Sequence, residues 1–413
     1  MQFRKEVLDN GLHVVAECDD SAHTTALGFF VNTGARDESD ELSGVSHFLE
    51  HMLFKGTPSR SAEDVNREFD EMGAHYNAFT SEEHTVYYAA VLPELQNRVL
   101  DLLGDILRPS LREEDFETEK QVIVEEIKMY ADQPPFCGDD RCKALYFGDH
   151  PLGRSILGTA ETVTRLTASQ MRDYFLQRYS PSNITLAAAG KVDFASMVEA
   201  ARKISKPWER REVLRELPVV HPRSEFELIN HEPATQQYTM HLAAGPAAMD
   251  QDRYAAKVLT VIVGDDTGSR MYWDLIDPGK VDHVSLGHHD YQGAGIYMMY
   301  MSCHPDQTAS NLEVVDGIYR QIELQGIEQQ ELDQAKSKIN SRVVLASEKP
   351  RNRLFAIGGN WIQRREYKSV QEDLAIVDGL TVDDIHSVLE KFPLSQNTTL
   401  SIGPLKSLGQ PSV

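Results

Sequence analysis

The sequence contains little cysteine, and the few cysteines are scattered. Cys18, Cys137, Cys142 and Cys303 are the only four in 413 residues, too few and too far apart for a disulfide framework. Cys137 and Cys142 are close in sequence but lack the CxxC spacing of a zinc knuckle. We therefore expect ordinary free thiols.

Basic charge is also in short supply. Lys and Arg number 41 against 64 Asp and Glu, which gives a formal net charge of −23. Nucleic acids require basic patches on their protein partners, so we expect no nucleic-acid binding. An acidic surface is compatible with basic peptides as partners, although it also simply keeps a protein soluble.

Long hydrophobic runs and several common motifs are missing as well. No window approaches the 18 consecutive apolar residues of a membrane span, so no membrane association is expected. The N-terminal stretch MQFRKEVLDNGLHVVAECDD has no apolar signal-peptide core, which predicts a cytoplasmic protein. The absence of GxGxxG after a strand, of GxxxxGKS/T and of GxSxG argues against the commonest nucleotide-binding and serine-hydrolase functions.

The stretch SGVSHFLEHMLFKGT, residues 43–57, places two histidines and a glutamate in an otherwise apolar helix pattern. His47 and His51 are four residues apart and share a helix face, where two neutral imidazoles suit zinc. Glu50 lies at the edge of that face, within reach of a water molecule. Burying three polar side chains without partners would cost several kcal/mol, and a metal ion removes that cost. The order H-x-x-E-H is the inverzincin motif, so we predict one zinc per chain, with Mn²⁺ or Co²⁺ left open.

A catalytic zinc needs a third protein ligand and an open position for water. Residues 115–134, DFETEKQVIVEEIKMYADQP, have helical periodicity. At about 100° per residue, Glu119 and Glu126 fall within about 60° of Ile123, whereas Glu125 points away from it. We therefore predict Glu126 as the third ligand and Glu119 as a catalytic carboxylate that orients a histidine or tunes the water. Glu125 is expected to be solvated.

The two halves of the chain resemble each other. LTASQMRDYFLQRYSPSNITLAAAG, from Leu166, matches LTVDDIHSVLEKFPLSQNTTLSIG, from Leu380, at several positions. Aligning Gly34 with Gly245 pairs a second set of segments, and it places three apolar residues opposite the metal motif, namely Val258, Val261 and Ile262. The second copy therefore lacks metal ligands.

Each half mixes strands and helices without regular βαβ alternation. We predict an α+β fold of two similar halves, each a mostly antiparallel sheet packed with helices. The expected division is a zinc-bearing half at residues 1–205, a linker at 206–224 where prolines and mixed charges interrupt the periodicity, and a second half at 225–413.

These motifs resemble those of the pitrilysin family of inverzincin metallopeptidases, and they look closest to bacterial homologues of the mitochondrial processing peptidase beta subunit. The resemblance rests on HFLEHMLFKGT, GAHYNAFTSEEHTVYY (73–88), EKQVIVEEIKMYADQP and HPLGRSILG (150–158). It implies zinc held by His47, His51 and Glu126, with Glu50 as general base. It also implies a duplicated LuxS-like metallohydrolase fold and a chamber that admits unfolded peptides.

The resemblance also implies how substrate is bound. The family's edge strand, onto which a peptide adds by main-chain hydrogen bonds, is matched here by Asn77, Ala78, Phe79 and Thr80. Family members usually carry an arginine and, seven residues later, a tyrosine in the second half. The matching positions here hold Ile276 and His283. We expect His283 to contact substrate and a related subunit to supply the missing arginine–tyrosine pair.

Together these features predict a zinc-dependent endopeptidase that hydrolyses peptides or unfolded protein segments, as the catalytic subunit of a homodimer or heterodimer. Glu50 would take a proton from water and deliver it to the leaving amine. Two alternatives stay open. One is a non-catalytic structural or binding subunit of a larger complex that retains the peptidase fold, and the intact HxxEH residues weigh against it. The other is a zinc hydrolase of a non-peptide substrate, and the edge strand weighs against that.

Overall fold

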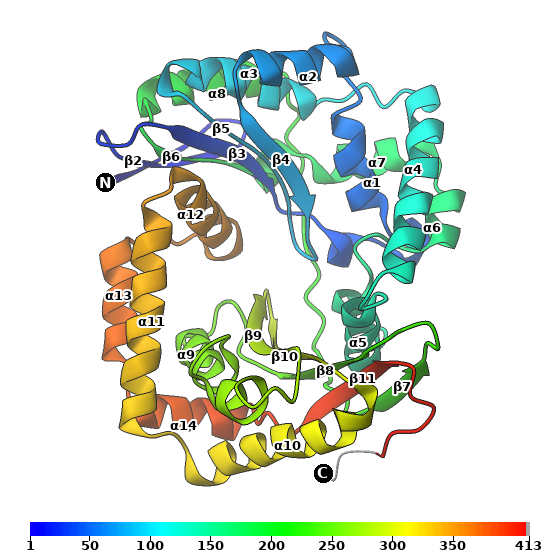
Figure 1. Ribbon diagram of the computed structural model, residues 1–413. Helices are drawn as coiled ribbons and strands as arrows, with labels where there is room; N and C mark the ends of the chain where they lie inside the picture. The colour runs from blue at the N-terminus through cyan, green and yellow to red at the C-terminus, as the bar shows by residue number, and fades with distance from the viewer. Residues whose placement is uncertain (410–413) are drawn as a thin grey trace. The chain divides into compact units, whose positions relative to one another are not determined.

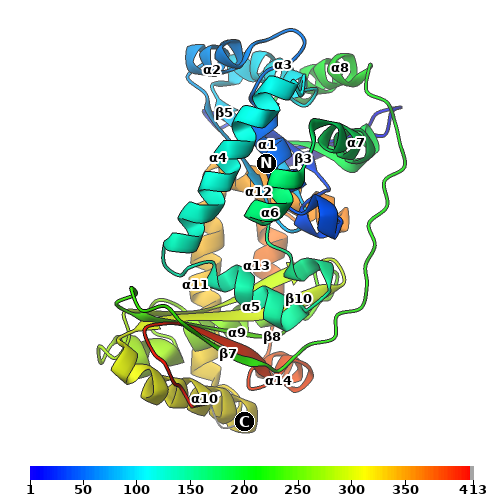
Figure 2. The same cartoon turned by 90° about the vertical axis from the view of Figure 1, so that its right-hand side faces the viewer.

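The computed structural model describes residues 1–409, which form two compact units (Figure 1). The units do not follow sequence order. Unit 1 contains residues 1–128, 154–216 and 344–368, and unit 2 contains residues 129–153, 217–343 and those from 369 onward. The halves predicted at 1–205 and 225–413 therefore each give one segment to the other unit. Between them, residues 208–225 form no helix or strand (Figure 2).

Unit 1 is built on a six-stranded sheet in the order β1-β2-β6-β3-β5-β4. All neighbours are antiparallel except β2 and β6. Strands β3 and β6 are buried throughout, as near-continuous apolar strands at the centre of a covered sheet should be. The strands are β1 (Gln2–Val7), β2 (His13–Cys18), β3 (Thr25–Val31), β4 (His75–Thr80), β5 (Thr85–Val91) and β6 (Ile184–Gly190).

Unit 2 repeats this sheet without its first strand. The order is β7-β11-β8-β10-β9, and only β7 and β11 are parallel. The central strand pair β3–β6 of unit 1 corresponds to β8–β11 of unit 2. In the first pair Phe29 lies opposite Leu186, and in the second His241 lies opposite Thr399. The predicted α+β fold with two similar halves is confirmed. The strands are β7 (Phe226–Asn230), β8 (Gln237–Ala244), β9 (His283–Tyr291), β10 (Ala294–Cys303) and β11 (Asn397–Gly403).

Helices cover both faces of the sheet in unit 1. Seven lie over one face and share its main core. They are α1 (Val45–Leu53), α2 (Ala62–Glu71), α3 (Gln96–Ile106), α4 (Glu113–Asp132), α6 (Ala160–Arg165), α7 (Ala168–Arg178) and α8 (Phe194–Ser205). The other face is covered by α12 (Pro350–Arg364), which comes from the second sequence half (Figure 1).

The helices of unit 2 follow the same plan. One face of its sheet carries α9 (Arg253–Gly264), α10 (Thr308–Gln325), α11 (Gln329–Ser347), α13 (Val370–Gly379) and α14 (Val382–Lys391). The other face is covered by α5 (Gly138–Phe147), from the first sequence half. The exchange is thus reciprocal, and each sheet needs one helix from the other half to bury its second face. None of the helices in residues 1–409 is long and apolar enough to cross a membrane.

Candidate metal centre

Helix α1 starts at a turn that favours glycine. Gly44 has a φ of 94°, and a Cβ there would lie 2.5 Å from the carbonyl oxygen of Leu157. The buried side of α1 packs on α4, where Phe48 stacks on Phe116 with ring centroids 4.6 Å apart. The two helices therefore lie side by side (Figure 2). Their facing edges carry the candidate ligands.

His47, His51 and Glu126 come together between α1 and α4. Glu126 Oε2 lies 3.9 Å from His47 Nε2 and 3.7 Å from His51 Nε2, and one donor atom from each of the three residues falls within a 4.8 Å cluster. Tetrahedral zinc with bonds of about 2.0–2.1 Å needs ligand atoms about 3.3–3.4 Å apart. The observed spacings require only small side-chain shifts, and two imidazoles with one carboxylate are a donor set that zinc accepts.

Glu119 orients one of these histidines. Its Oε1 accepts a hydrogen bond of 2.9 Å from His51 Nδ1, and its Oε2 pairs with Lys55 Nζ at 2.6 Å. Because a carboxylate can only accept, the proton sits on Nδ1 and the lone pair of Nε2 is free to face Glu126. Burial raises the pKa of Glu119, but the His51 and Lys55 contacts outweigh it and hold the pKa below its usual value.

The protonation states suit a cation site. Burial, with a smaller effect from His51, lowers the pKa of His47 to about 4, so this ring is neutral at neutral pH. Burial also acts to lower the pKa of His51, but the neighbouring carboxylates of Glu119, Glu126 and Glu50 raise it overall. Without a metal, a proton on His51 balances the negative charge of these carboxylates. A bound metal cation would balance that charge instead.

Glu50 is hydrogen-bonded to the edge strand and interacts electrostatically with His51 and Glu126 of the ligand cluster. Thr80 Oγ1, in β4, donates a hydrogen bond of 2.6 Å to Glu50 Oε2. Burial raises the pKa of Glu50, and the Thr80 bond opposes that rise. Thr80 was predicted only as part of the substrate strand. The sequence carries no signal for this bond, because the two residues are 30 positions apart and meet only in the folded sheet.

Strand β4 is an edge strand, as predicted for residues 77–80. Among residues 1–409 it pairs with β5 only, so its other edge is not covered by a neighbouring strand. Phe79 is 37% exposed, while Ala78 is buried. Asn77 Oδ1 lies 2.9 Å from the main-chain N–H of Ala78. The strand can therefore accept an added peptide along the edge that ends beside Glu50.

The remaining predicted residues lie elsewhere. Glu125 is exposed and pairs with Lys128, as expected for a solvated residue. His283 begins β9 in unit 2, where it is exposed and its Nε2 lies 3.2 Å from Ser285 Oγ. Ile276 packs partly buried on the unit 2 core. The substrate-binding role of His283 stays a prediction.

In unit 2 the counterpart of this centre is a cavity where, among the described residues, no group of three His, Cys, Asp or Glu side chains comes together. The buried pattern of Phe48, Leu49, Met52 and Leu53 in α1 recurs in α9 as Val258, Leu259, Ile262 and Val263. The equivalents of His47, Glu50 and His51 are therefore Lys257, Thr260 and Val261, one residue before those that the sequence alignment paired. The core-facing residues of α4 and α11 can be aligned in the same way. Phe116 and Ile123 in α4 then correspond to Leu332 and Ile339 in α11, and the position of Glu126 is taken by Arg342.

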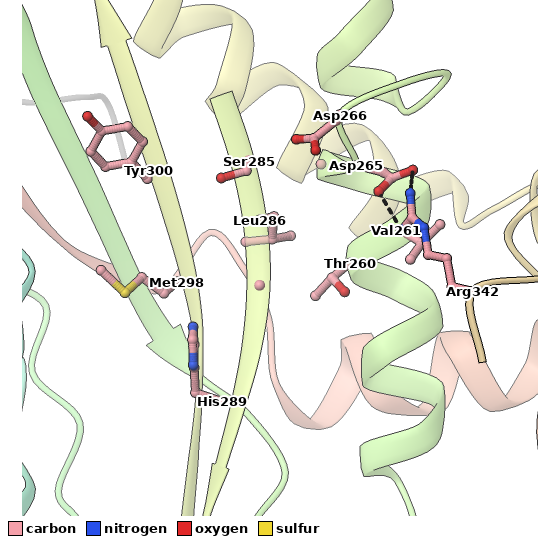
Figure 3. Close-up of a pocket in the computed structure, with 12 residues that line it drawn as sticks. Thr260, Val261, Asp265, Asp266, Ser285, Leu286, His289, Met298, Tyr300 and Arg342 are labelled. Carbon is pink, nitrogen blue, oxygen red and sulfur yellow. Dashed lines mark hydrogen bonds and ion pairs between the residues drawn. The ribbon is translucent and has the colours of Figure 1, made fainter. Parts of the chain in front are cut away.

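This cavity has a volume of about 380 Å³, and its lining includes Thr260, Val261, Asp265, His289 and Arg342. Figure 3 shows these side chains. Arg342 is held by Asp265, with Nη1 2.8 Å from Oδ1. A guanidinium can only donate hydrogen bonds, so Arg342 cannot serve as a metal ligand at the place that Glu126 occupies in unit 1. Among residues 1–409, the only group of three or more His, Cys, Asp or Glu side chains that could hold a metal is the one in unit 1.

Known proteins share both the sequence and the fold. Residues 13–160 match the family model described as "Insulinase (Peptidase family M16)", and residues 165–339 match "Peptidase M16 inactive domain". The chain is 30% identical to a protein of Mycobacterium tuberculosis named as an uncharacterized zinc protease, over 97% of this chain and 93% of that protein. It is 32% identical to a Streptomyces coelicolor protein so named, over 98% and 90%. The crystal structure of a Helicobacter pylori protease superposes with a TM-score of 0.90 at 19% identity, covering 98% and 99% of the two chains.

Proposed function

The chain belongs to peptidase family M16, and we propose that it is a zinc-dependent endopeptidase that hydrolyses peptides or unfolded protein segments. The name of zinc protease carried by its relatives supports this proposal. The observation that carries it is the meeting of three elements in unit 1: a ligand cluster on α1 and α4, the carboxylate of Glu50, and the free edge of β4.

Each residue has a role in the proposed reaction. His47, His51 and Glu126 would hold zinc, which when bound polarises a peptide carbonyl and acidifies a water molecule. The carboxylate of Glu50 accepts the proton of the attacking water and delivers it to the leaving amine. Thr80 fixes the direction of that carboxylate. The elevated pKa of Glu50 makes it a stronger base than an exposed glutamate.

The edge of β4 supplies the substrate site. A peptide that adds as a further strand is held by main-chain hydrogen bonds, which are independent of its side chains. Only an extended segment can pair in this way. The proposed substrate class is therefore flexible peptides or unfolded segments, and a folded domain would have to open first.

We also propose that the active form is a homodimer or a heterodimer. The family's arginine–tyrosine pair is replaced by Ile276 and His283. A second copy of this chain would not restore the pair, so in a heterodimer a related subunit would supply those two side chains. Light scattering of the purified chain gives its mass in solution. A monomer that stays active would contradict this part of the proposal.

The experiment that tests the proposed function is hydrolysis of an unstructured, internally quenched peptide by the purified chain. We expect cleavage that a chelator stops and that added zinc restores. If the chain alone cleaves nothing, adding a related subunit with the arginine–tyrosine pair should restore activity. Failure of both would leave the alternative of a non-catalytic subunit that retains the peptidase fold.

A further inference from the structure

The segment that follows α8, residues 206–216, packs on unit 1 instead of extending freely from it. Trp208 is buried in the unit 1 core, with the guanidinium of Arg108 4.1 Å from its ring centroid. Further on, Ser180 Oγ donates a hydrogen bond of 2.8 Å to the carbonyl of Arg211. The segment is thus fastened to unit 1 at successive points before the chain re-enters unit 2 at residue 217.

The last residue that fastens this segment to unit 1 is Arg215. It is the most buried of the charged residues in the segment 206–216. Its Nε and Nη2 donate to the two carboxylate oxygens of Asp37 at 2.9 and 2.7 Å. Nη2 also donates to the main-chain oxygen of Glu83. The side chains of Arg215 and Asp37 are 7% and 1% exposed. A planar guanidinium that makes two parallel hydrogen bonds to a carboxylate fixes the orientation of that carboxylate as well as neutralising its charge.

Asp37 belongs to a loop, residues 34–38, that holds both sides of the metal centre. On one side, Glu38 accepts hydrogen bonds of 2.7 Å from the main-chain N–H groups of Gly44 and Ser46, at the start of α1. These N–H groups have no partner within the helix, so Glu38 serves as the cap of α1. The loop therefore fixes where the helix of the metal ligands begins.

On its other side, the loop holds the turn that follows β4. The main-chain N–H groups of Ala35 and Arg36 donate to the carbonyls of Ser81 and Glu82, at 3.2 and 2.9 Å. The side chain of Arg36 pairs with that of Glu83, and both are almost fully buried. The loop thus joins the start of α1 to the end of β4. It is across this junction that Thr80 reaches Glu50.

We propose that Arg215 is a positioning residue of the metal centre, which locks loop 34–38 onto the β4–β5 turn and so sets the spacing between α1 and the substrate strand. Arg215 grips the loop through Asp37 and the turn through Glu83, and so reinforces the direct bonds between these two parts. Without it, the spacing would rest on the loop's own main-chain bonds and the Arg36–Glu83 pair. The inference rests on the proposed function only for its kinetic readout.

The test compares three variants of the full-length chain. Arg215→Met removes the fork but keeps an apolar stem of similar length. Arg215→Lys keeps the charge but cannot grip Asp37 in two places. The matched control is Arg211→Met, because the Arg211 side chain is exposed and meets only Glu209 on the surface, at 3.2 Å.

The first readout is amide hydrogen exchange of the zinc-free protein. In Arg215→Met we expect at least tenfold faster exchange in peptides that cover residues 44–46 and 81–84, with peptides of β6 unchanged. Arg215→Lys should fall between this variant and the wild type, and Arg211→Met should match the wild type. Unchanged exchange at both places, or equal acceleration throughout unit 1, would overturn the inference. If Arg215→Met does not fold, Arg215→Lys decides by the same criterion.

The second readout is kinetic. In Arg215→Met we expect kcat to fall at least tenfold, KM to stay within about twofold, and zinc content to stay at the wild-type level, because the ligands and the strand remain but are misplaced relative to each other. A rise in KM alone would overturn a positioning role. If the wild type cleaves no peptide either alone or with a related subunit added, the proposed function is refuted instead, and hydrogen exchange still decides the role of Arg215.

Discussion

Replacing Glu119 by Gln tests whether the centre binds zinc through an oriented histidine. The carboxylate accepts from His51 Nδ1 at 2.9 Å and pairs with Lys55 at 2.6 Å. Glu119 is only 4% exposed, so water cannot take its place. Gln keeps the shape and can still accept from His51, but it is a weaker acceptor and leaves Lys55 without a counter-charge.

The size of the effect follows from this arrangement. Loss of a partner that orients a metal-binding histidine typically lowers metal affinity by about 10- to 100-fold, or about 1.4–2.8 kcal/mol. We expect Glu119→Gln to fall in that range in a competition titration against a chromophoric zinc chelator at pH 7. Glu125→Gln is the matched control on the same helix, because the Glu125 side chain is 72% exposed and pairs only with Lys128 on the surface.

Two results would refute this reasoning. Wild-type affinity in Glu119→Gln would mean that the hydrogen bond to His51 contributes nothing to metal binding. A loss as large as that of Glu126→Gln, which removes a direct ligand, would mean that Glu119 itself binds the metal.

Three further predictions address the base, the fold and the response to acid. Thr80→Val should lower kcat about tenfold while zinc content is unchanged, since it removes one hydrogen bond to a charged group; an unchanged kcat would exclude a role for this bond. Residues 1–224 expressed alone should aggregate or bind hydrophobic dye, because the sheet face that α12 covers would be open; a folded monomer by light scattering would contradict this. His241 is fully buried and burial lowers its pKa to about 3, so its contribution to stability is complete above pH 6.5 and is lost as the pH falls toward 3. The free energy of unfolding should drop by about 2 kcal/mol between pH 7 and pH 5 through this residue, and His241→Leu should lose less over that interval in urea titrations; an equal loss would show that His241 does not cause it.

The local part of the metal centre could be predicted from the sequence. The convergence of His47 and His51 follows from helix geometry alone, and the burial of Ile123 was enough to choose Glu126 over Glu125. The structure brings His47, His51 and Glu126 together, as expected from arguments that depend on residues within one helix turn or two, and their role as metal ligands stays a prediction. Glu119 lies seven residues before Glu126 on the same helix face, and the structure places its carboxylate 2.9 Å from His51 Nδ1; its role at the metal centre stays a prediction.

Long-range features could not be predicted in this way. The exchange of α5 and α12 between the sequence halves leaves no local pattern, because each helix is amphipathic whichever sheet it covers. The alignment of the halves slipped by one residue at α9, since the connection before the helix differs in length between the copies. Arg215 looked like one more solvated charge in a linker of mixed charges, and only the tertiary fold brings it to Asp37.

The central claim is that Glu50 acts as the base at a zinc centre without binding the metal. Its most direct test measures zinc content and peptide hydrolysis on the same preparation of Glu50→Gln. We predict zinc at the wild-type level, one per chain, and hydrolysis reduced by about 10²- to 10⁴-fold, as for loss of a general base. Loss of zinc from this variant, or hydrolysis at the wild-type rate, would contradict the account.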